Sequence, residues 1–224
     1  MGVEMIYEDA ELLVCEKSAG FPVQSRRIGE KDCVSVLKSY LYEKNPGKGE
    51  PYLGIVHRLD QPVEGVMVFA KTRSAAANLS GQLSKNGFCK KYQAVVCGKM
   101  EQKSGTLVDY LRKDGKTNMS FVMTKDAEGT KRAELSYRVL KEQELYSLVE
   151  IDLVTGRHHQ IRVQMANAGH PLYGDRKYAP AGERAAGKEA IGLCAVKLTF
   201  FHPKTKKKME FFCQPTGQCF SWFA

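Results

Sequence analysis

The sequence predicts an α+β fold with a mixed, mostly antiparallel central sheet flanked by helices and loops. Two observations support this prediction. Short apolar runs of the kind that form strands occur along the whole chain. Segments with helical spacing are few, and they do not alternate strictly with the strands. The 224 residues are 43% hydrophobic and 26% charged, a globular composition in a length typical of one domain. We therefore expect a single domain over residues 1–224.

The first third of the chain contains four expected strands and two expected helices. Short apolar runs predict strands at 5–7, 12–16, 55–56 and 66–70. Residues 33–44 carry apolar side chains at helical spacing, and Pro46 breaks the pattern. Thr72 is a typical N-cap residue, so a second helix is expected from there to Gly87.

The rest of the chain is expected to be mainly strands with one helix. The expected strands are 90–99, 119–123, 133–140, 145–156, 191–202 and 207–215. The last two form a hairpin around Pro203. Gly156 ends one strand, and residues 157–169 are expected to be a helix closed by Gly169. Residues 179–190 are low in complexity and are expected to form a mobile surface loop.

The charge and the cysteines narrow the class of protein. Lys and Arg total 34 against 25 Asp and Glu, a net charge of +9 that favours a polyanionic partner. No apolar run is long enough to span a membrane, and the N-terminus does not resemble a signal peptide, so a soluble, cytoplasmic protein is expected. The seven cysteines are odd in number and lack C-x-x-C spacing, which predicts reduced, buried thiols.

A first candidate for chemistry is the segment from His57 to Asp60. It connects two apolar stretches, and loops of this kind present catalytic side chains on a rigid scaffold. Asp60 could act as a nucleophile, a base or a metal ligand. The alternative is an exposed loop carboxylate paired with Arg58.

A second candidate is the segment from Thr155 to Arg162. Arg157 and His158 are expected in the first turn of the helix, where backbone N–H groups attract anions. His158 and His159 are expected to face different ways on this helix. The alternative is a solvated basic helix face. The histidine and cysteine spacings match no zinc site, so no metal is expected. Nucleotide-binding glycine motifs are absent, so no nucleotide cofactor is expected either.

Five segments in sequence order resemble the RluA-like family of RNA pseudouridine synthases. They are YEDAELLVCEKSAGFPV, HRLDQPVEGVMVFAKT, KKYQAVVCG, TGRHHQIRVQMANAGHPLYGDRKY and LCAVKLTFFHPKTKKKMEF. The resemblance implies a pseudouridine synthase catalytic fold without an N-terminal S4 domain. It also implies that uridine in RNA is isomerised to pseudouridine, with no metal and no organic cofactor.

The resemblance implies a role for four residues. Asp60, the aspartate of the HRLD motif, is the expected catalytic nucleophile, and Arg162 pairs with it. Tyr92 packs on the target base, and Arg58 fills the gap left when the base is flipped out of the RNA. The physical logic agrees, because an adjacent arginine keeps a carboxylate ionised and oriented.

Further RNA contacts are expected from residues near these motifs and from the final hairpin. We assign His57, Arg157 and the hairpin-turn lysines Lys204, Lys206 and Lys207 to RNA binding, the lysines as phosphate contacts. A solvated turn is the alternative for the lysines.

The chain departs from the family pattern at three places. Ser18 stands where proline is usual, residues 61–64 are Gln-Pro-Val-Glu in place of Arg-Asp-Thr-Ser, and Cys194 replaces a frequent histidine. The second departure alters the loop beside Asp60.

The resemblance as a whole predicts a monomeric enzyme acting on tRNA or rRNA. The alternatives are a non-catalytic RNA chaperone that uses the same basic cleft and a carboxylate hydrolase that acts on nucleosides.

Overall fold

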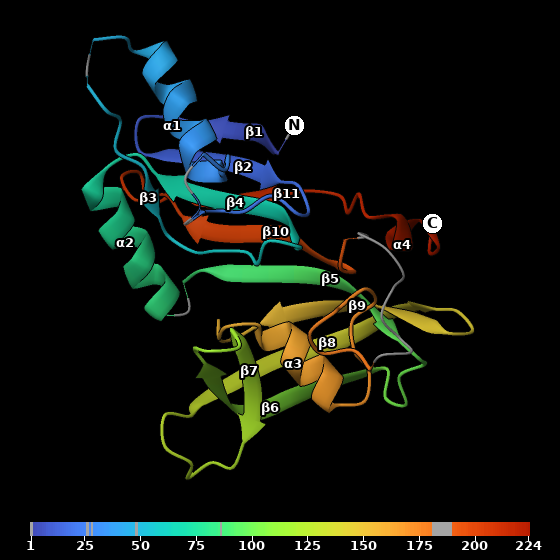
Figure 1. The fold of residues 1–224 in the computed structure, drawn as a ribbon. Coiled ribbons are helices and arrows are strands. Elements are labelled where there is room, and N and C mark those ends of the chain that lie inside the picture. Colours follow the sequence, from blue (N-terminus) through green and yellow to red (C-terminus); the bar gives the residue numbers. More distant parts are fainter. Residues whose placement is uncertain (1, 26, 28, 48, 86, 181–189) are drawn as a thin grey trace. The chain divides into compact units, whose positions relative to one another are not determined.

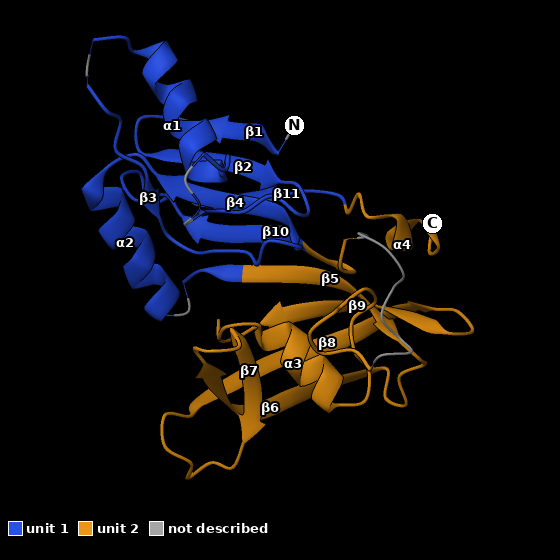
Figure 2. Ribbon diagram, viewed as in Figure 1, with its two compact units in different colours: residues 1–89, 195–214 blue, residues 90–194, 215–224 orange. Residues whose placement is uncertain are grey.

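The computed structural model describes residues 2–25, 27, 29–47, 49–85, 87–180 and 190–224. Contacts divide the chain into two compact units, shown in Figures 1 and 2. Unit 1 comprises Met1–Cys89 and Ala195–Gln214, and unit 2 comprises Lys90–Cys194 and Pro215–Ala224. The single domain expected over 1–224 stays a prediction. The expected mobile loop at 179–190 lies almost entirely outside the described residues.

Unit 1 is built on a sheet in which β1, β2, β4 and β10 are neighbours in that order. Two further strands attach to it, since β3 pairs with β4 and β11 pairs with β10. Their bounds are β1 Val3–Glu8, β2 Leu12–Lys17, β3 Gly54–Ile55, β4 Glu64–Ala70, β10 Leu193–Phe201 and β11 Lys208–Phe212. Strand β4 is buried along its whole length, as expected for a central strand. The predicted final hairpin is confirmed by the antiparallel pairing of β10 with β11.

Two helices accompany this sheet. Helix α1 (Cys33–Lys44) begins at Asp32, whose side chain accepts a hydrogen bond from Ser35 N while the Ser35 hydroxyl accepts one from Asp32 N. Helix α2 (Arg73–Ser84) begins at the predicted cap Thr72, whose hydroxyl accepts from Ala75 N, and it packs against β3 and β4. Both helices are confirmed, although α2 ends before Gly87.

Unit 2 is built on an antiparallel sheet with the strand order β5-β9-β8-β6-β7. The bounds are β5 Cys89–Cys97, β6 Ser104–Asp114, β7 Met119–Met123, β8 Lys131–Glu142 and β9 Tyr146–Leu153. Leu111, Ala133 and Val163 form a buried cluster beneath helix α3 (Gln160–Asn167). One face of the sheet is therefore covered by α3.

The start of α3 corrects the sequence-based expectation. The helix begins at Gln160, so Arg157 and His158 precede it and do not form its first turn. His159 has a φ of 52°, in the left-handed region, and this residue turns the chain into the helix. The Gln160 side-chain oxygen accepts from Arg157 N at 2.9 Å and so closes the preceding turn.

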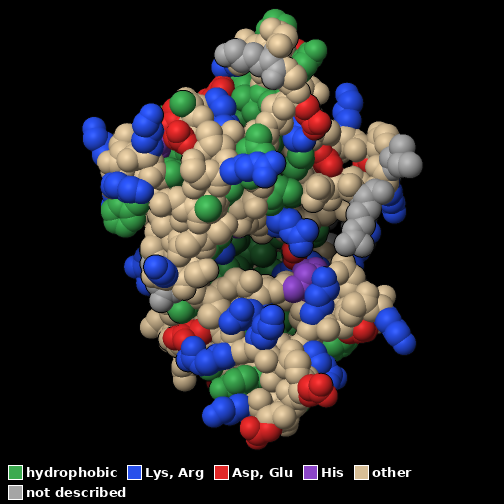
Figure 3. All heavy atoms as spheres, turned by 90° about the vertical axis from the view of Figure 1, so that its left-hand side faces the viewer, with side chains coloured by type: hydrophobic (Ala, Val, Ile, Leu, Met, Phe, Trp, Pro, Cys, Tyr) green, Lys and Arg blue, Asp and Glu red, His purple; other side chains and the backbone are tan. Residues whose placement is uncertain are grey.

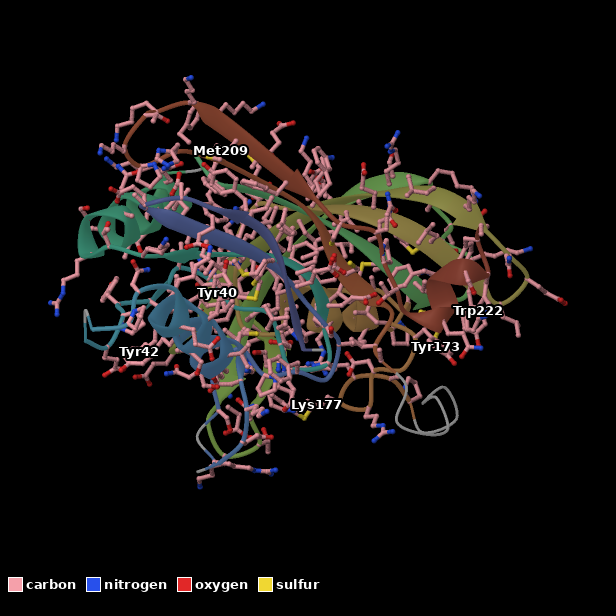
Figure 4. The ribbon with its side chains drawn as sticks, turned by 90° about the horizontal axis from the view of Figure 1, so that it is seen from above. Tyr40, Tyr42, Tyr173, Lys177, Met209 and Trp222 are labelled. Carbon is pink, nitrogen blue, oxygen red and sulfur yellow. The ribbon has the colours of Figure 1, made fainter. Side chains whose placement is uncertain are left out.

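The C-terminal segment packs within unit 2 through aromatic rings. Tyr173 and Trp222 lie side by side, with ring centroids 4.9 Å apart in an edge-to-face arrangement (Figure 4). Tyr146 lies 5.0 Å from Trp222. These contacts fix the short helix α4 (Gln218–Ser221), which the sequence pattern did not predict.

The described structure confirms the α+β class. All seven cysteines are thiols rather than disulfides, and five of them are buried; Cys89 is exposed and Cys97 is partly exposed. No helix in the described part of the chain has the length and apolar character needed to cross a lipid bilayer.

Candidate active site

Asp60 lies in the loop that leads into β4 of unit 1, and it is half-buried. Its carbonyl accepts a hydrogen bond from Val63 N at 3.0 Å, which closes a tight turn. The next carbonyl, that of Gln61, accepts from Gly20 N at 2.8 Å, and the Gln61 side chain donates back to Gly20 O at 3.1 Å. The loop that carries Asp60 is thus tied to the loop after β2.

Lys17 is the second tie between these loops. Its side chain is fully buried, and its ammonium donates to the carbonyls of Ser18, Phe21 and Gln61 at 2.9, 2.8 and 3.1 Å. All three donors of the ammonium are therefore used. Burial lowers the pKa of Lys17 to about 8, although the charges of nearby groups, Asp60 among them, raise it. Lys17 is therefore mostly protonated at neutral pH and places a positive charge near Asp60.

Gly65 explains how this loop enters the sheet. Its φ is +130°, and a Cβ at this position would lie 2.5 Å from Ala195 N and Ala195 O of β10. Any side chain would push these strands apart. The glycine therefore fixes the place where the loop after Asp60 becomes β4.

The two residues predicted beside Asp60 have different surroundings. Arg58 is exposed, as an RNA-inserting residue needs to be. His57 is half-buried; its Nε2 accepts from Val68 N at 3.2 Å, and its ring lies 5.4 Å from that of Phe88. This contact gives His57 a part in the packing of unit 1, and its expected role in RNA binding stays a prediction.

Tyr92 lies on β5 of unit 2 and is only 6% exposed. It pairs directly with Ile151, which in turn pairs with Tyr137 on β8. Tyr137 and Ala133 lie on the same face of β8 because their positions differ by an even number. Ala133 packs against Val163 of α3. Tyr92 therefore lies on the sheet face that α3 covers.

Arg162 lies in α3 and is 5% exposed, which excludes the alternative of a solvated basic helix face for this residue. Its guanidinium binds Asp175 in a bidentate manner, with Nε–Oδ2 and Nη2–Oδ1 both at 2.8 Å. The Asp175 carboxylate also accepts from the backbone N–H groups of Lys177 and Tyr178 at 2.9 and 3.3 Å. Arg162 is thus held by a carboxylate that is itself fixed by the backbone.

Tyr178 extends this network to the histidines. Its ring lies 5.3 Å from the Arg162 guanidinium. Its hydroxyl accepts from Ser120 N at 2.7 Å and lies 2.8 Å from His159 Nδ1. The rings of His158 and His159 stack at 3.8 Å, so the expectation that they face different ways on a helix is wrong. The cause is the left-handed backbone of His159, which ends the extended chain before the helix begins.

The remaining predicted RNA contacts are exposed cations. Arg157 is exposed and donates from Nε to Arg132 O at 2.9 Å. Lys204, Lys206 and Lys207 are exposed in the turn between β10 and β11. Lys and Arg side chains predominate over acidic ones on the molecular face drawn in Figure 3. The exposure of the three lysines fits both alternatives, a contact with RNA phosphates and a turn that only faces solvent.

Among the described residues, no group of three or more His, Cys, Asp or Glu side chains is placed to hold a metal ion. The structure also assigns work to residues that the sequence analysis gave no role, namely Lys17, Asp175, Tyr178 and Ser120. Three of them lie within segments that carry the resemblance. Their roles could not be predicted, because the order of residues along the chain does not show which side chains and carbonyls they contact.

Comparison with known proteins gives consistent matches. A family model described as RNA pseudouridylate synthase matches residues 11–167. The uncharacterized RNA pseudouridine synthase YlyB of Bacillus subtilis is 34% identical over 214 residues, which cover 94% of this chain and 68% of that protein. The ribosomal large subunit pseudouridine synthase D of Vibrio cholerae is 34% identical over 220 residues, 93% of this chain and 66% of that protein. The chain thus spans about two thirds of the length of these relatives.

A solved structure agrees on the fold. Human RNA Pseudouridylate Synthase Domain Containing 4 superposes with a TM-score of 0.78 over 95% of this chain and 89% of that one, at 22% identity. The fold and the matched region define an RNA-modifying isomerase class. The chain belongs to the RluA-like family of RNA pseudouridine synthases.

Proposed function

We propose that this protein isomerises uridine to pseudouridine within structured RNA, with Asp60 as the nucleophile. The observation that carries the proposal is the family match over residues 11–167, which includes Asp60, Tyr92 and Arg162. The loop anchoring around Asp60 supports it, since a nucleophile must be held in place before it attacks.

Each of the other roles follows from the same proposal. The target base leaves the RNA stack at a cost of a few kcal/mol, and Arg58 fills the gap. Tyr92 packs on the flipped base, and Arg162 keeps the Asp60 carboxylate ionised and oriented. The reaction rearranges bonds within one nucleotide, so no group is lost or gained.

The substrate is proposed to be rRNA or tRNA. A relative named for the large ribosomal subunit supports rRNA. The net charge of +9 supports an RNA partner of either kind. A cytoplasmic, monomeric enzyme is the corresponding proposal for location and assembly.

The test uses RNA that lacks the modification made by this protein. We expect wild-type protein to create pseudouridine at a defined site, mapped at single-nucleotide resolution, and Asp60→Ala to reduce conversion to background. RNA affinity of Asp60→Ala should stay within a few fold of wild type, because the side chain is needed for chemistry.

Two outcomes would contradict the proposal. Tight RNA binding without pseudouridine from either protein would favour the chaperone alternative. Release of free uracil would favour a hydrolase.

A further inference from the structure

Two adjacent lysines on β5 have opposite surroundings. Lys91 pairs with Asp152 at 2.9 Å and with Glu150 at 3.4 Å. Lys90 is also partly buried, but among the described residues its ammonium has no hydrogen bond or ion pair. Burial lowers the pKa of Lys90, as expected for an ammonium removed from water without a compensating anion. A partly buried ammonium without an anion is energetically unfavourable, which suggests that a ligand supplies the anion.

The position of Lys90 relates it to the proposed substrate site. It lies two residues before Tyr92 on the same strand, so both side chains lie on the sheet face that α3 covers. A Cβ built on Gly156 would lie 3.3 Å from Lys90 Nζ, so the absence of a side chain there leaves room beside the ammonium. Arg157, which is exposed, follows Gly156 directly.

We propose that Lys90 binds a backbone phosphate of the RNA next to the nucleotide that packs on Tyr92, with Arg157 as a second cation beside it. The proposal rests on the proposed function, because it takes the nucleotide at Tyr92 as given. A phosphate oxygen supplies the anion that the ammonium lacks and accepts a charge-assisted hydrogen bond. Lys91 cannot serve in this way, because its charge is already balanced on the opposite face of the strand.

The chain offers a matched pair of variants for the test. Lys90→Gln and Lys91→Gln remove the same charge from neighbouring positions, so both change the net charge of the protein equally. Binding of a 20-nucleotide uridine oligonucleotide is measured at several salt concentrations. We expect Lys90→Gln to raise the Kd by about 5- to 20-fold and to lower the slope of log K against log salt by about 0.7. Lys91→Gln should change the Kd by less than about 2-fold.

A stability measurement separates phosphate binding from a structural role. If Lys90 binds phosphate, Lys90→Gln should unfold at the same temperature as wild type or higher, since the unpaired buried charge is gone. Lys90→Arg should restore most of the affinity. Equal effects of the two glutamine variants, an unchanged salt slope for Lys90→Gln, or a loss of affinity that follows a loss of stability would overturn the proposal.

Neutral linkages then locate the phosphate. Oligonucleotides with a single methylphosphonate are scanned along the chain. At one linkage we expect wild type to lose affinity and Lys90→Gln to be indifferent, whereas elsewhere both should respond alike. No such linkage would count against a specific phosphate. Because these readouts measure binding, they stay informative even if no pseudouridine forms and the proposed function fails.

Discussion

The surroundings of Asp60 in unit 1 and of Arg162 in unit 2 are held by different chemical groups. Around Asp60 the acceptors are main-chain carbonyls, those of Ser18, Phe21 and Gln61, bound by one buried lysine. Around Arg162 the partners are side chains, chiefly Asp175. A carbonyl is present whatever the side chain, so the first arrangement tolerates substitution and the second does not.

Two of the three departures from the family pattern follow this difference. Ser18 and residues 61–64 lie in the two loops that Lys17 ties together, where the sequence supplies carbonyls. Pro62 has no N–H to donate, but the hydrogen bonds of this loop do not need one, because they use Val63 N and Gly20 N. None of the three departures lies in the segment around Arg162 and Asp175. The altered loop can therefore hold Asp60 in place with unusual side chains.

The largest effect is expected from removing Asp175. Asp175→Ala removes the bidentate carboxylate partner of the buried Arg162 guanidinium, and such a loss costs about 3–5 kcal/mol of the free energy of unfolding. Chemical denaturation would measure it, and pseudouridine formation should fall as well. Asp152→Ala in the same unit is the control, because its carboxylate is half exposed and its ion pair contributes about 1 kcal/mol or less. Equal losses for the two variants would show that Arg162 does not depend on Asp175.

A smaller effect is expected from Lys17→Met. Methionine fills the space but removes the ammonium donor from three carbonyls, of which those of Gln61 and Ser18 keep a backbone N–H donor. The cost is roughly 1–3 kcal/mol, because removal of a buried charge offsets part of the loss. Since the loop of Asp60 loosens, kcat should fall more than RNA affinity does. Lys38→Met removes a surface ion pair with Glu50 and should change neither quantity measurably. A wild-type kcat for Lys17→Met would mean that other contacts suffice to place the loop.

The sequence predicted the elements better than the contacts that organise the site. Helix α1 was predicted at its observed bounds, because the apolar spacing of residues 33–44 and the helix-breaking Pro46 are local properties of the chain. The start of α3 was not, because the left-handed His159 depends on Tyr178, which lies 19 residues further on. The Arg162–Asp175 pair likewise joins residues whose distance in space no spacing rule gives. Motif resemblance nominated Asp60, Tyr92 and Arg162, and their roles stay predictions.

The smallest effect is expected at Gln61, where main-chain carbonyls rather than side chains are expected to hold the loop of Asp60. Gln61→Arg restores the residue usual in the family, yet it keeps the carbonyl that binds Lys17 and Gly20. Only the exposed bond from the Gln61 amide to Gly20 O is lost, so the free energy of unfolding should change by less than about 0.5 kcal/mol. The added charge acts on RNA affinity and its salt dependence instead. A destabilisation near that of Lys17→Met would show that side chains, rather than main-chain carbonyls, hold the loop of Asp60, and the contrast between the two units would then fail.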